Sequence, residues 1–246
     1  MDQPRLKTLE RLISKSGLGS RTDARRWIGA GRVAVNSRVV RNPDEWFDPE
    51  RTRISFDGKP LRSGRKVYIA LYKPRGYITT YHDPQGRPTV YSLIEDLGQW
   101  VAPVGRLDRD TSGLLLMTSD TDFIERMANP AYKVPKTYLV KAASLLTDEQ
   151  LEALRRGIQL EDGPTQPAEV SRLRDSGSRT FLEITIREGR NRQVRRMIEA
   201  AGSHVLKLVR TAIGGLTIGD LPIGKWRELN AAEVRALMPR ATKTKD

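Results

Sequence analysis

A run of four apolar residues, Leu114 to Met117, constrains the fold more than any other stretch of this chain. A short, uninterrupted apolar run fits a strand that is buried on both faces. Further strands are indicated over 67–72, 138–140 and 181–186, the last of which alternates in polarity. These strands interleave irregularly with helix-like segments, and no repeat period is visible. The pattern predicts an α+β fold with a mixed, mostly antiparallel sheet flanked by helices.

Several helix starts are indicated by capping residues. Ser20 and Thr147 are each followed three residues later by an acidic or amide side chain, as in a capping box. We expect Ser119 and Asn191 to cap two further helices in the second half of the chain.

The first quarter of the chain has the pattern of a small separate domain. Residues 6–61 contain two short helical stretches and then three short strand-like stretches, with turn signals between the strands. The polar segment 62–66 has no apolar anchor and is interpreted as a linker. We expect a small domain over 1–64, a larger one over 65–241 and a disordered tail over 242–246.

The charge of the chain predicts a polyanionic partner. Its 246 residues include 43 Lys and Arg against 30 Asp and Glu, a net charge of +13. Residues 1–66 carry 16 of the basic and only 8 of the acidic residues, so much of the excess lies in the small domain. Nucleic acid is the favoured partner, ahead of an anionic membrane surface.

The composition also excludes several classes of protein. The chain has no cysteine, which excludes disulfides and thiolate chemistry, and its two histidines are too few and too far apart for a catalytic zinc site. No apolar run approaches the roughly 20 residues that span a bilayer, and the start has no apolar signal segment. We expect a soluble cytoplasmic protein that holds no metal.

The loop 105–113 is the first candidate site. It places two carboxylates and two guanidiniums directly before the buried strand, and loops at the rim of a central strand often carry function. The same residue types also form ordinary polar turns, so composition leaves both interpretations open. A calcium loop is excluded because its closing position falls on Ser119, where a glutamate is needed.

The segment 187–196 is the second candidate, with five arginines and one glutamate at a strand–turn–helix junction. Guanidiniums beside a helix N-terminus form a phosphate site. We expect Arg192, Arg195 and Arg196 on the helix face opposite the apolar one. The acids needed for local pairing are mostly missing, which favours an anionic partner, or a buried acid elsewhere in the chain, over a solvated charged face.

A weaker candidate is Tyr138, on a strand flanked by lysines, where a base could stack, although core tyrosines are commoner. The chain has no P-loop, no dinucleotide fingerprint and no nucleophile elbow. With these motifs excluded, the sequence favours chemistry that a carboxylate carries out without a cofactor.

Five ordered segments carry a family resemblance. Gly105 to Leu116, which reads Gly-Arg-Leu-Asp-Arg-Asp-Thr-Ser-Gly-Leu-Leu-Leu, resembles the catalytic motif of the RsuA/RluB group of bacterial ribosomal-RNA pseudouridine synthases. Further segments similar to that group follow its order: 71–76, with Tyr72 in place of the usual Asn, 136–138, 188–197 and 219–227. Residues 20–36 resemble the RNA-binding module first seen in ribosomal protein S-four. The resemblance implies a pseudouridine synthase fold after that module.

The resemblance also implies roles for individual residues. Asp108 would be the essential catalytic aspartate, Tyr138 would stack on the flipped uracil, and Arg195 would pair with Asp108. Arg106 is a weaker candidate for the same pocket. The residues expected to contact RNA are Arg21, Arg25, Arg26, Arg32, Lys73, Arg190, Arg192 and Arg196.

The chemistry of the reaction agrees with this set. Converting uridine to pseudouridine breaks the N1–C1′ bond and rejoins the base through C5, with no net redox change and so no need for a redox cofactor. The nucleotide must leave the RNA helix, at a cost of a few kcal/mol. A carboxylate can attack C1′ or remove the proton at C2′, and the sequence leaves both routes open.

The arginine-rich segment favours a uridine of 23S rRNA near the peptidyl-transferase centre, because the group's small-subunit enzymes carry a different version of it. The alternatives are a 16S rRNA target and a non-catalytic RNA-binding ribosome assembly factor. The expected partner is ribosomal RNA or a ribosome assembly intermediate, and a monomer is favoured.

Overall fold

The computed structural model describes residues 6–61 and 64–238 and divides the chain into two compact units. The first unit comprises residues up to Tyr68 together with 96–102 and 117–121. The second comprises 69–95, 103–116 and the chain from Asp122 onward. The expected tail, 242–246, lies outside the described residues, as do two residues of the expected linker.

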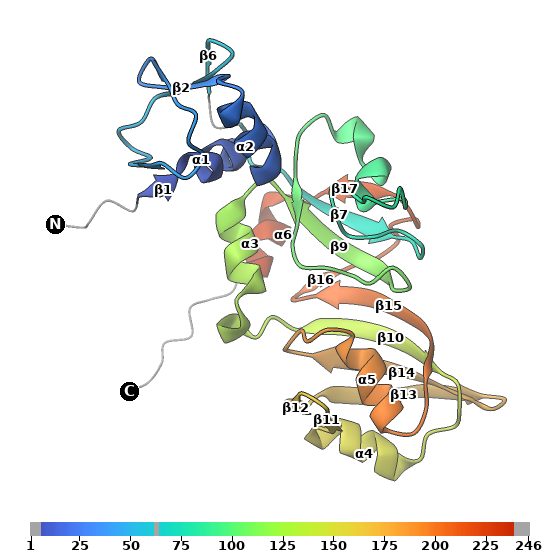
Figure 1. Ribbon diagram of the computed structural model, residues 1–246. Helices are drawn as coiled ribbons and strands as arrows, with labels where there is room; N and C mark the ends of the chain where they lie inside the picture. The colour runs from blue at the N-terminus through green and yellow to red at the C-terminus, as the bar shows by residue number, and fades with distance from the viewer. Residues whose placement is uncertain (1–5, 62–63, 239–246) are drawn as a thin grey trace. The chain divides into compact units, whose positions relative to one another are not determined.

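The first unit packs two short helices against a small sheet (Figure 1). Its helices are α1 (Leu9–Lys15) and α2 (Arg21–Gly29). Its strands are β1 (Lys7–Thr8), β2 (Val33–Val35), β3 (Arg38–Val39), β4 (Trp46–Phe47), β5 (Ile54–Phe56) and β6 (Lys59–Pro60). β1 pairs with β4, and the other four form a sheet in the order β3-β2-β5-β6. The core consists of Leu9, Ile13, Ala24, Ile28, Val33, Val35 and Val40.

Local signals set the elements of this unit. Ser20 caps α2 in the expected capping box, since its hydroxyl accepts a hydrogen bond from the amide of Asp23. Between β2 and β3, Asn36 and Ser37 both have positive φ, at 48° and 69°. This is the turn geometry that favours short polar residues between paired strands, so the predicted turn is confirmed.

The second unit is built on a nine-stranded mixed sheet in the order β13-β14-β10-β15-β9-β7-β17, with β16 on β15 and β8 on β9. The strands are β7 (Tyr68–Lys73), β8 (Ala102–Pro103), β9 (Ser112–Thr118), β10 (Lys136–Ala142), β13 (Glu169–Ser176), β14 (Arg179–Ile186), β15 (Val205–Ile213), β16 (Leu216–Thr217) and β17 (Trp226–Glu228). The pairing of β15 with β9 is parallel, whereas β10 is antiparallel to both β14 and β15. The expected α+β fold is confirmed.

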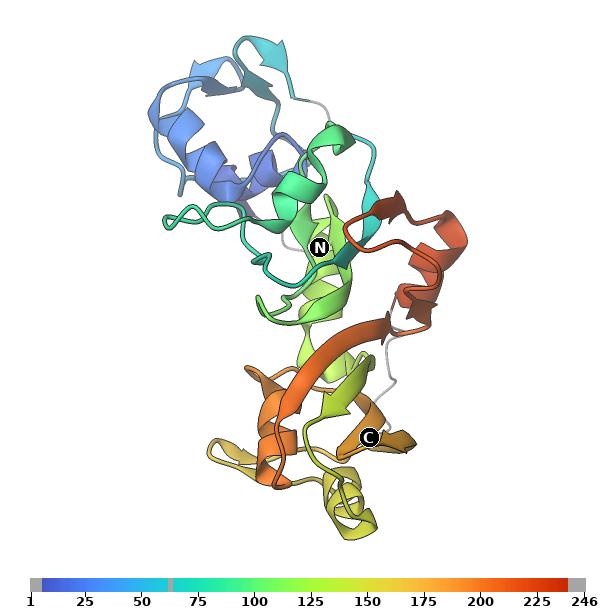
Figure 2. The same ribbon diagram turned by 90° about the vertical axis from the view of Figure 1, so that its right-hand side faces the viewer.

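Helices and a small hairpin complete this unit. The helices are α3 (Thr121–Ala128), α4 (Asp148–Arg156), α5 (Gln193–Ala200) and α6 (Ala231–Leu237), and the 3-10 turns are η1 (Val90–Leu93), η2 (Glu95–Leu97) and η3 (Pro130–Tyr132). β11 (Gln159–Leu160) and β12 (Gly163–Pro164) form the hairpin. α4 contacts β13, and α5 contacts β15 and β11. Figure 2 shows β15, in orange-red, as a long curved strand after α5.

The strand predictions hold at the level of single side chains. Every residue of β9 is buried, as expected for a central strand covered on both faces. Along β14, Leu182, Ile184 and Ile186 are buried while Glu183 is exposed, which confirms the alternation. Thr147 caps α4 in the predicted capping box.

Two predicted caps are wrong. α3 begins at Thr121, and the hydroxyl of Ser119 instead accepts a hydrogen bond from the amide of Val67 at 3.0 Å. α5 begins at Gln193, and its N-cap is Arg192, in a left-handed conformation without a side-chain cap, rather than Asn191. For Ser119 the competing partner, Val67, lies 52 residues away in the chain.

Candidate active site

A cavity of about 670 Å³ lies in the second unit. Its walls come from the loop before β9, the segment from α3 to β10, the arginine-rich turn before α5, and β15. The charged and aromatic side chains that line it include Arg106, Asp108, Tyr138, Arg192 and Arg210. The structure therefore brings the first two candidate segments and Tyr138 to one hollow.

Asp108 presents its carboxylate to this cavity with 34% of the side chain exposed. Nη1 of Arg192 lies 3.6 Å from its Oδ2. The backbone carbonyl of Asp108 accepts hydrogen bonds from the Nζ of Lys73 at 2.9 Å and from the amide of Thr111 at 3.1 Å. The loop is thus fixed through its backbone while the carboxylate stays accessible. A carboxylate in this setting can act as a nucleophile or as a base.

Lys73 fixes the loop that carries Asp108 by hydrogen bonds to its backbone. Its side chain is fully buried, and Nζ donates to the carbonyls of Pro74, Asp108 and Thr111 at 3.1, 2.9 and 2.7 Å. Burial is the largest cause that lowers the pKa of Lys73 to about 8; nearby Arg210 lowers it further, against the charges of Asp108 and Asp110. The prediction that Lys73 contacts RNA is therefore wrong, because none of its side chain reaches the surface.

Arg195 pairs with the neighbouring carboxylate rather than with the expected one. Its Nη2 lies 3.2 Å from the Oδ2 of Asp110 and also donates to the carbonyl of Asp110 and the hydroxyl of Thr111. Burial raises the pKa of Asp110, but the hydrogen bond from Arg192 and the charge of Arg195 bring it below its usual value. The expected Arg195–Asp108 pair is corrected to Arg195–Asp110.

Arg195 is also not on a solvated helix face, since only 9% of its side chain is exposed. The expected grouping with Arg192 and Arg196 opposite the apolar face is wrong for this residue. α5 turns Arg195 inward, against the loop that carries Asp108.

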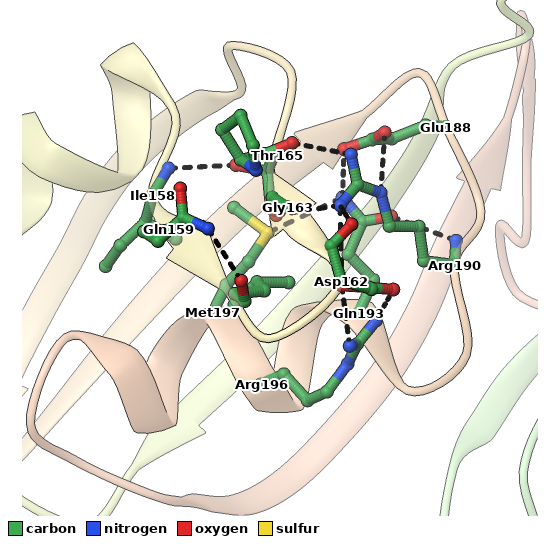
Figure 3. Close-up of polar contacts among 12 residues, drawn as sticks. Ile158, Gln159, Asp162, Gly163, Thr165, Glu188, Arg190, Gln193, Arg196 and Met197 are labelled. Carbon is green, nitrogen blue, oxygen red and sulfur yellow. Dashed lines mark hydrogen bonds and ion pairs between the residues drawn. The ribbon is translucent and has the colours of Figure 1, made fainter.

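The rest of the arginine-rich turn is held by the β11–β12 hairpin (Figure 3). Both Nη atoms of Arg196 contact the carboxylate of Asp162, at 2.9 and 3.1 Å. Arg190 donates to the carbonyls of Gly163 and Pro164 and lies 3.4 Å from Asp162. The acid that pairs with these two arginines comes from elsewhere in the chain, but Asp162 is 49% exposed, so the predicted buried acid is wrong for them.

Gln193 and Glu188 close the same turn. The side chain of Gln193 accepts from the amide of Arg190 at 3.1 Å and donates to Glu188. Glu188 also accepts from the amide of Gln166 at 3.0 Å. This network fixes the start of α5 and so the positions of Arg192 and Arg195 (Figure 3).

Tyr138 lies on the cavity side of the sheet and is 8% exposed. In the ladder between β10 and β15 it is directly opposite Arg210, which is 3% exposed and lines the same cavity. Arg106 is an exposed residue at the rim. Arg210 was not among the residues predicted from the sequence, where the signal for it was a charge inside a mostly apolar strand that also contains Lys207.

The arginines expected to bind RNA in the first unit all form ion pairs. Arg21 and Arg25 both contact Glu10, whose side chain is 1% exposed, and Arg25 also contacts Asp44. Further pairs join Arg26 to Asp23 and Arg32 to Asp57. The four guanidinium-bearing side chains nevertheless remain 44–71% exposed. They form an accessible basic surface on and beside α2.

Over the described ranges, no cluster of three or more His, Cys, Asp or Glu side chains could hold a metal ion. In the same ranges no helix is long and apolar enough to cross a membrane. The chemical groups that line the cavity include the carboxylates of Asp108 and Glu188, the ring of Tyr138 and several cationic side chains.

Comparisons with known proteins confirm the resemblance. The family model described as RNA pseudouridylate synthase matches residues 67–200, and the S4 domain model matches residues 8–45. The chain is 42% identical to an uncharacterized RNA pseudouridine synthase of Aquifex aeolicus (strain VF5), over 93% of this chain and 92% of that one. It is 40% identical to the ribosomal large subunit pseudouridine synthase B of Bacillus subtilis (strain 168), over 94% and 96%.

A solved structure described as a pseudouridylate synthase has the same fold. It superposes with a TM-score of 0.68 at 31% identity and covers 94% of this chain and 99% of its own. Sequence and structure thus agree over nearly the whole length. The chain belongs to the RNA pseudouridylate synthase family and joins an S4 domain to the enzyme's pseudouridine synthase domain.

Proposed function

We propose that this enzyme converts one uridine of 23S rRNA, near the peptidyl-transferase centre, to pseudouridine. The observation that carries the proposal is the accessible carboxylate of Asp108 in a cavity that also contains Tyr138. The large-subunit target is supported by the name of the Bacillus subtilis relative, which matches over 96% of its length.

The proposed reaction begins when the target nucleotide flips out of the RNA helix into the cavity. Tyr138 supplies a face on which the uracil stacks, which offsets part of the lost stacking energy. Asp108 then acts on the ribose, at C1′ as a nucleophile or at the C2′ proton as a base, and the C1′–N1 bond breaks. The base turns and C5 bonds to C1′; in the first route this breaks the bond between Asp108 and C1′, and in the second Asp108 returns the proton to C2′. C5 then loses its proton and N1 gains one.

The other charged groups position these two residues. Lys73 fixes the loop through the carbonyls of Asp108 and Thr111, and Arg195 fixes it through Asp110. Arg192 places Nη1 3.6 Å from Oδ2 of Asp108, at the same wall of the cavity.

The S4 domain is proposed to dock on structured RNA through Arg21, Arg25, Arg26 and Arg32. Their exposed guanidiniums can contact backbone phosphates, which position the RNA and make binding depend on salt. We propose that the active form is a monomer and that it works without a cofactor in the cytoplasm.

The target is tested by incubating the purified enzyme with unmodified 23S and 16S rRNA transcripts and with ribosomal particles from a strain that lacks it. Pseudouridines are then mapped by carbodiimide-dependent reverse-transcription stops. A new stop in 23S rRNA is expected. A stop only in 16S rRNA would assign the target uridine to the small subunit. RNA binding without any stop would favour the non-catalytic assembly factor.

A further inference from the structure

Arg210 is a buried cation whose hydrogen bonds are incomplete. Its side chain is 3% exposed, and Nε donates to the carbonyl of Leu114 at 2.7 Å. Nη2 is buried and has no hydrogen-bond partner among residues 6–61 and 64–238. An unsatisfied buried charge is costly, so a protein retains one where a ligand completes it.

The other buried cations around the cavity are engaged with the protein itself. Lys73 donates to three carbonyls, and Arg195 is paired with Asp110. Lys136, which also lines the cavity, donates to the carbonyl of Val134 at 3.1 Å. Nε of Arg195 is also buried without a hydrogen-bond partner among the described residues, but Arg195 does not line the cavity. Arg210 differs because its open donor belongs to a side chain that does line it.

The backbone fixes the place of Arg210 closely. It pairs with Tyr138 across the β10–β15 ladder and with Gly113 across the β15–β9 ladder. A Cβ on Gly113 would lie 2.2 Å from the carbonyl oxygen of Arg210, so only glycine lets the two strands approach this closely. The loop that carries Asp108 therefore leads directly into the strand that holds Arg210 in place.

The proposed reaction creates a charge that a guanidinium can stabilise. When the C1′–N1 bond breaks, its electron pair goes to N1, and the negative charge spreads over the ring to the carbonyl oxygens. The charge disappears when C5 bonds to C1′, C5 loses its proton and N1 gains one. A preorganised donor aimed at such an oxygen lowers the barrier because its position needs no change during the reaction.

We infer, on the basis of the proposed function, that Arg210 donates through its free Nη2 to a carbonyl oxygen of the flipped uracil. It holds the base beside Tyr138 and stabilises the negative charge that the ring carries while detached from the ribose. Arg210 is thus a further catalytic residue of the cavity, distinct from Asp108 and Arg195.

The test compares wild type with Arg210→Met and Arg210→Lys, and uses Arg227→Met as a matched control. Arg227 lies in β17 of the same sheet and is paired with Glu233, and the cavity does not include it. Single-turnover rates at saturating RNA are measured together with RNA affinity. We expect Arg210→Met to slow turnover about 100-fold, as for removal of one oxyanion donor. Arg210→Lys should recover part of the rate, with RNA affinity unchanged.

A substrate variant separates this role from a structural one. RNA with 2-thiouridine or 4-thiouridine at the target weakens the hydrogen bond accepted at one carbonyl position. We expect one of the two to slow wild type and Arg227→Met but not Arg210→Met, because the bond is already gone there. Equal thio effects in all the variants would overturn the inference. The inference would also be overturned if Arg210→Met changed only the effect of a phosphorothioate in the RNA backbone, because Arg210 would then contact a phosphate.

The outcomes also separate this inference from the proposed function. If wild type forms no pseudouridine in either rRNA or in the particles, the proposed function fails. If wild type is active and Arg210→Met turns over at the same rate, the inference alone fails.

Discussion

The arginines of the S4 domain and those around the cavity form a contrast within one basic chain. Arg26 and Arg32 are 71% and 44% exposed and pair with carboxylates at the surface. Arg195 is 9% exposed and Arg210 is 3% exposed, and both contact the protein backbone. Exposed pairs are weak and exchange partners easily, whereas buried ones are fixed in position. Exposed arginines therefore suit RNA docking, and buried ones suit positioning.

Glu10 shows where this contrast weakens. Its carboxylate is buried in the S4 domain, and Arg21 and Arg25 both hold it. Burial raises the pKa of Glu10, but the two hydrogen-bonded guanidiniums bring it below its usual value. Arg21 and Arg25 thus combine an exposed position with a structural contact, and Arg26 is the cleaner test of docking alone.

Removing one arginine from each region should give the largest difference in stability. Arg195→Met removes a buried guanidinium that contacts Asp110 and the hydroxyl of Thr111, although Arg192 still contacts the carboxylate of Asp110 at 3.2 Å. We expect the free energy of unfolding to fall by about 2–3 kcal/mol in urea denaturation. The free energy of unfolding of Arg32→Met should fall far less, because solvent and salt screen the pair of Arg32 with Asp57. Equal losses in the two variants would remove the contrast.

An effect of similar size is expected in the pH dependence of stability that arises from Lys73. Its pKa is about 8 when folded and about 10.4 when unfolded, so between these values the unfolded chain binds more protons. The free energy of unfolding should therefore rise with pH over this window, by at most about 3 kcal/mol. Urea titrations from pH 7 to 10.5 measure the rise. Lys73→Met should lack this component, and an identical pH slope in both proteins would contradict the burial of a charged lysine.

The smallest effects are expected in RNA docking. Arg25→Ala and Arg26→Ala should weaken RNA binding and each lower the slope of log affinity against log salt by about 1, as for one lost phosphate contact. Turnover at saturating RNA should stay near that of wild type. Arg51→Ala is the control, since Arg51 is 89% exposed but is not among the predicted contacts.

Filter binding over a range of salt concentrations measures these slopes. An unchanged slope for Arg26→Ala would count against the docking surface on α2. Because Arg25 also holds Glu10, a loss of stability in Arg25→Ala is measured alongside and separates unfolding from lost RNA contact.

Features that depend on local sequence were predicted well. Ser20 and Thr147 cap their helices because the partner amide lies only three residues away. The four apolar residues of β9 are buried because a central strand needs apolar side chains on both faces.

Features that depend on distant residues were not predictable from sequence. Lys73 is buried because carbonyls 35 and 38 residues away accept its hydrogen bonds. Arg195 takes Asp110 as its partner through the fold of a loop 85 residues earlier in the chain. The charge of Arg210 within β15 did not by itself indicate a role, since its environment is created by β9 and β10.

The central claim is that Asp108 carries out the chemistry in a cavity that the surrounding cations hold in shape. The most direct measurement is a single-turnover assay of wild type and Asp108→Asn on the unmodified rRNA that contains the target uridine, with RNA affinity and thermal unfolding measured in parallel. We predict that wild type forms pseudouridine and that Asp108→Asn forms none while it folds and binds RNA normally. Pseudouridine formed by Asp108→Asn at the wild-type rate would contradict the account.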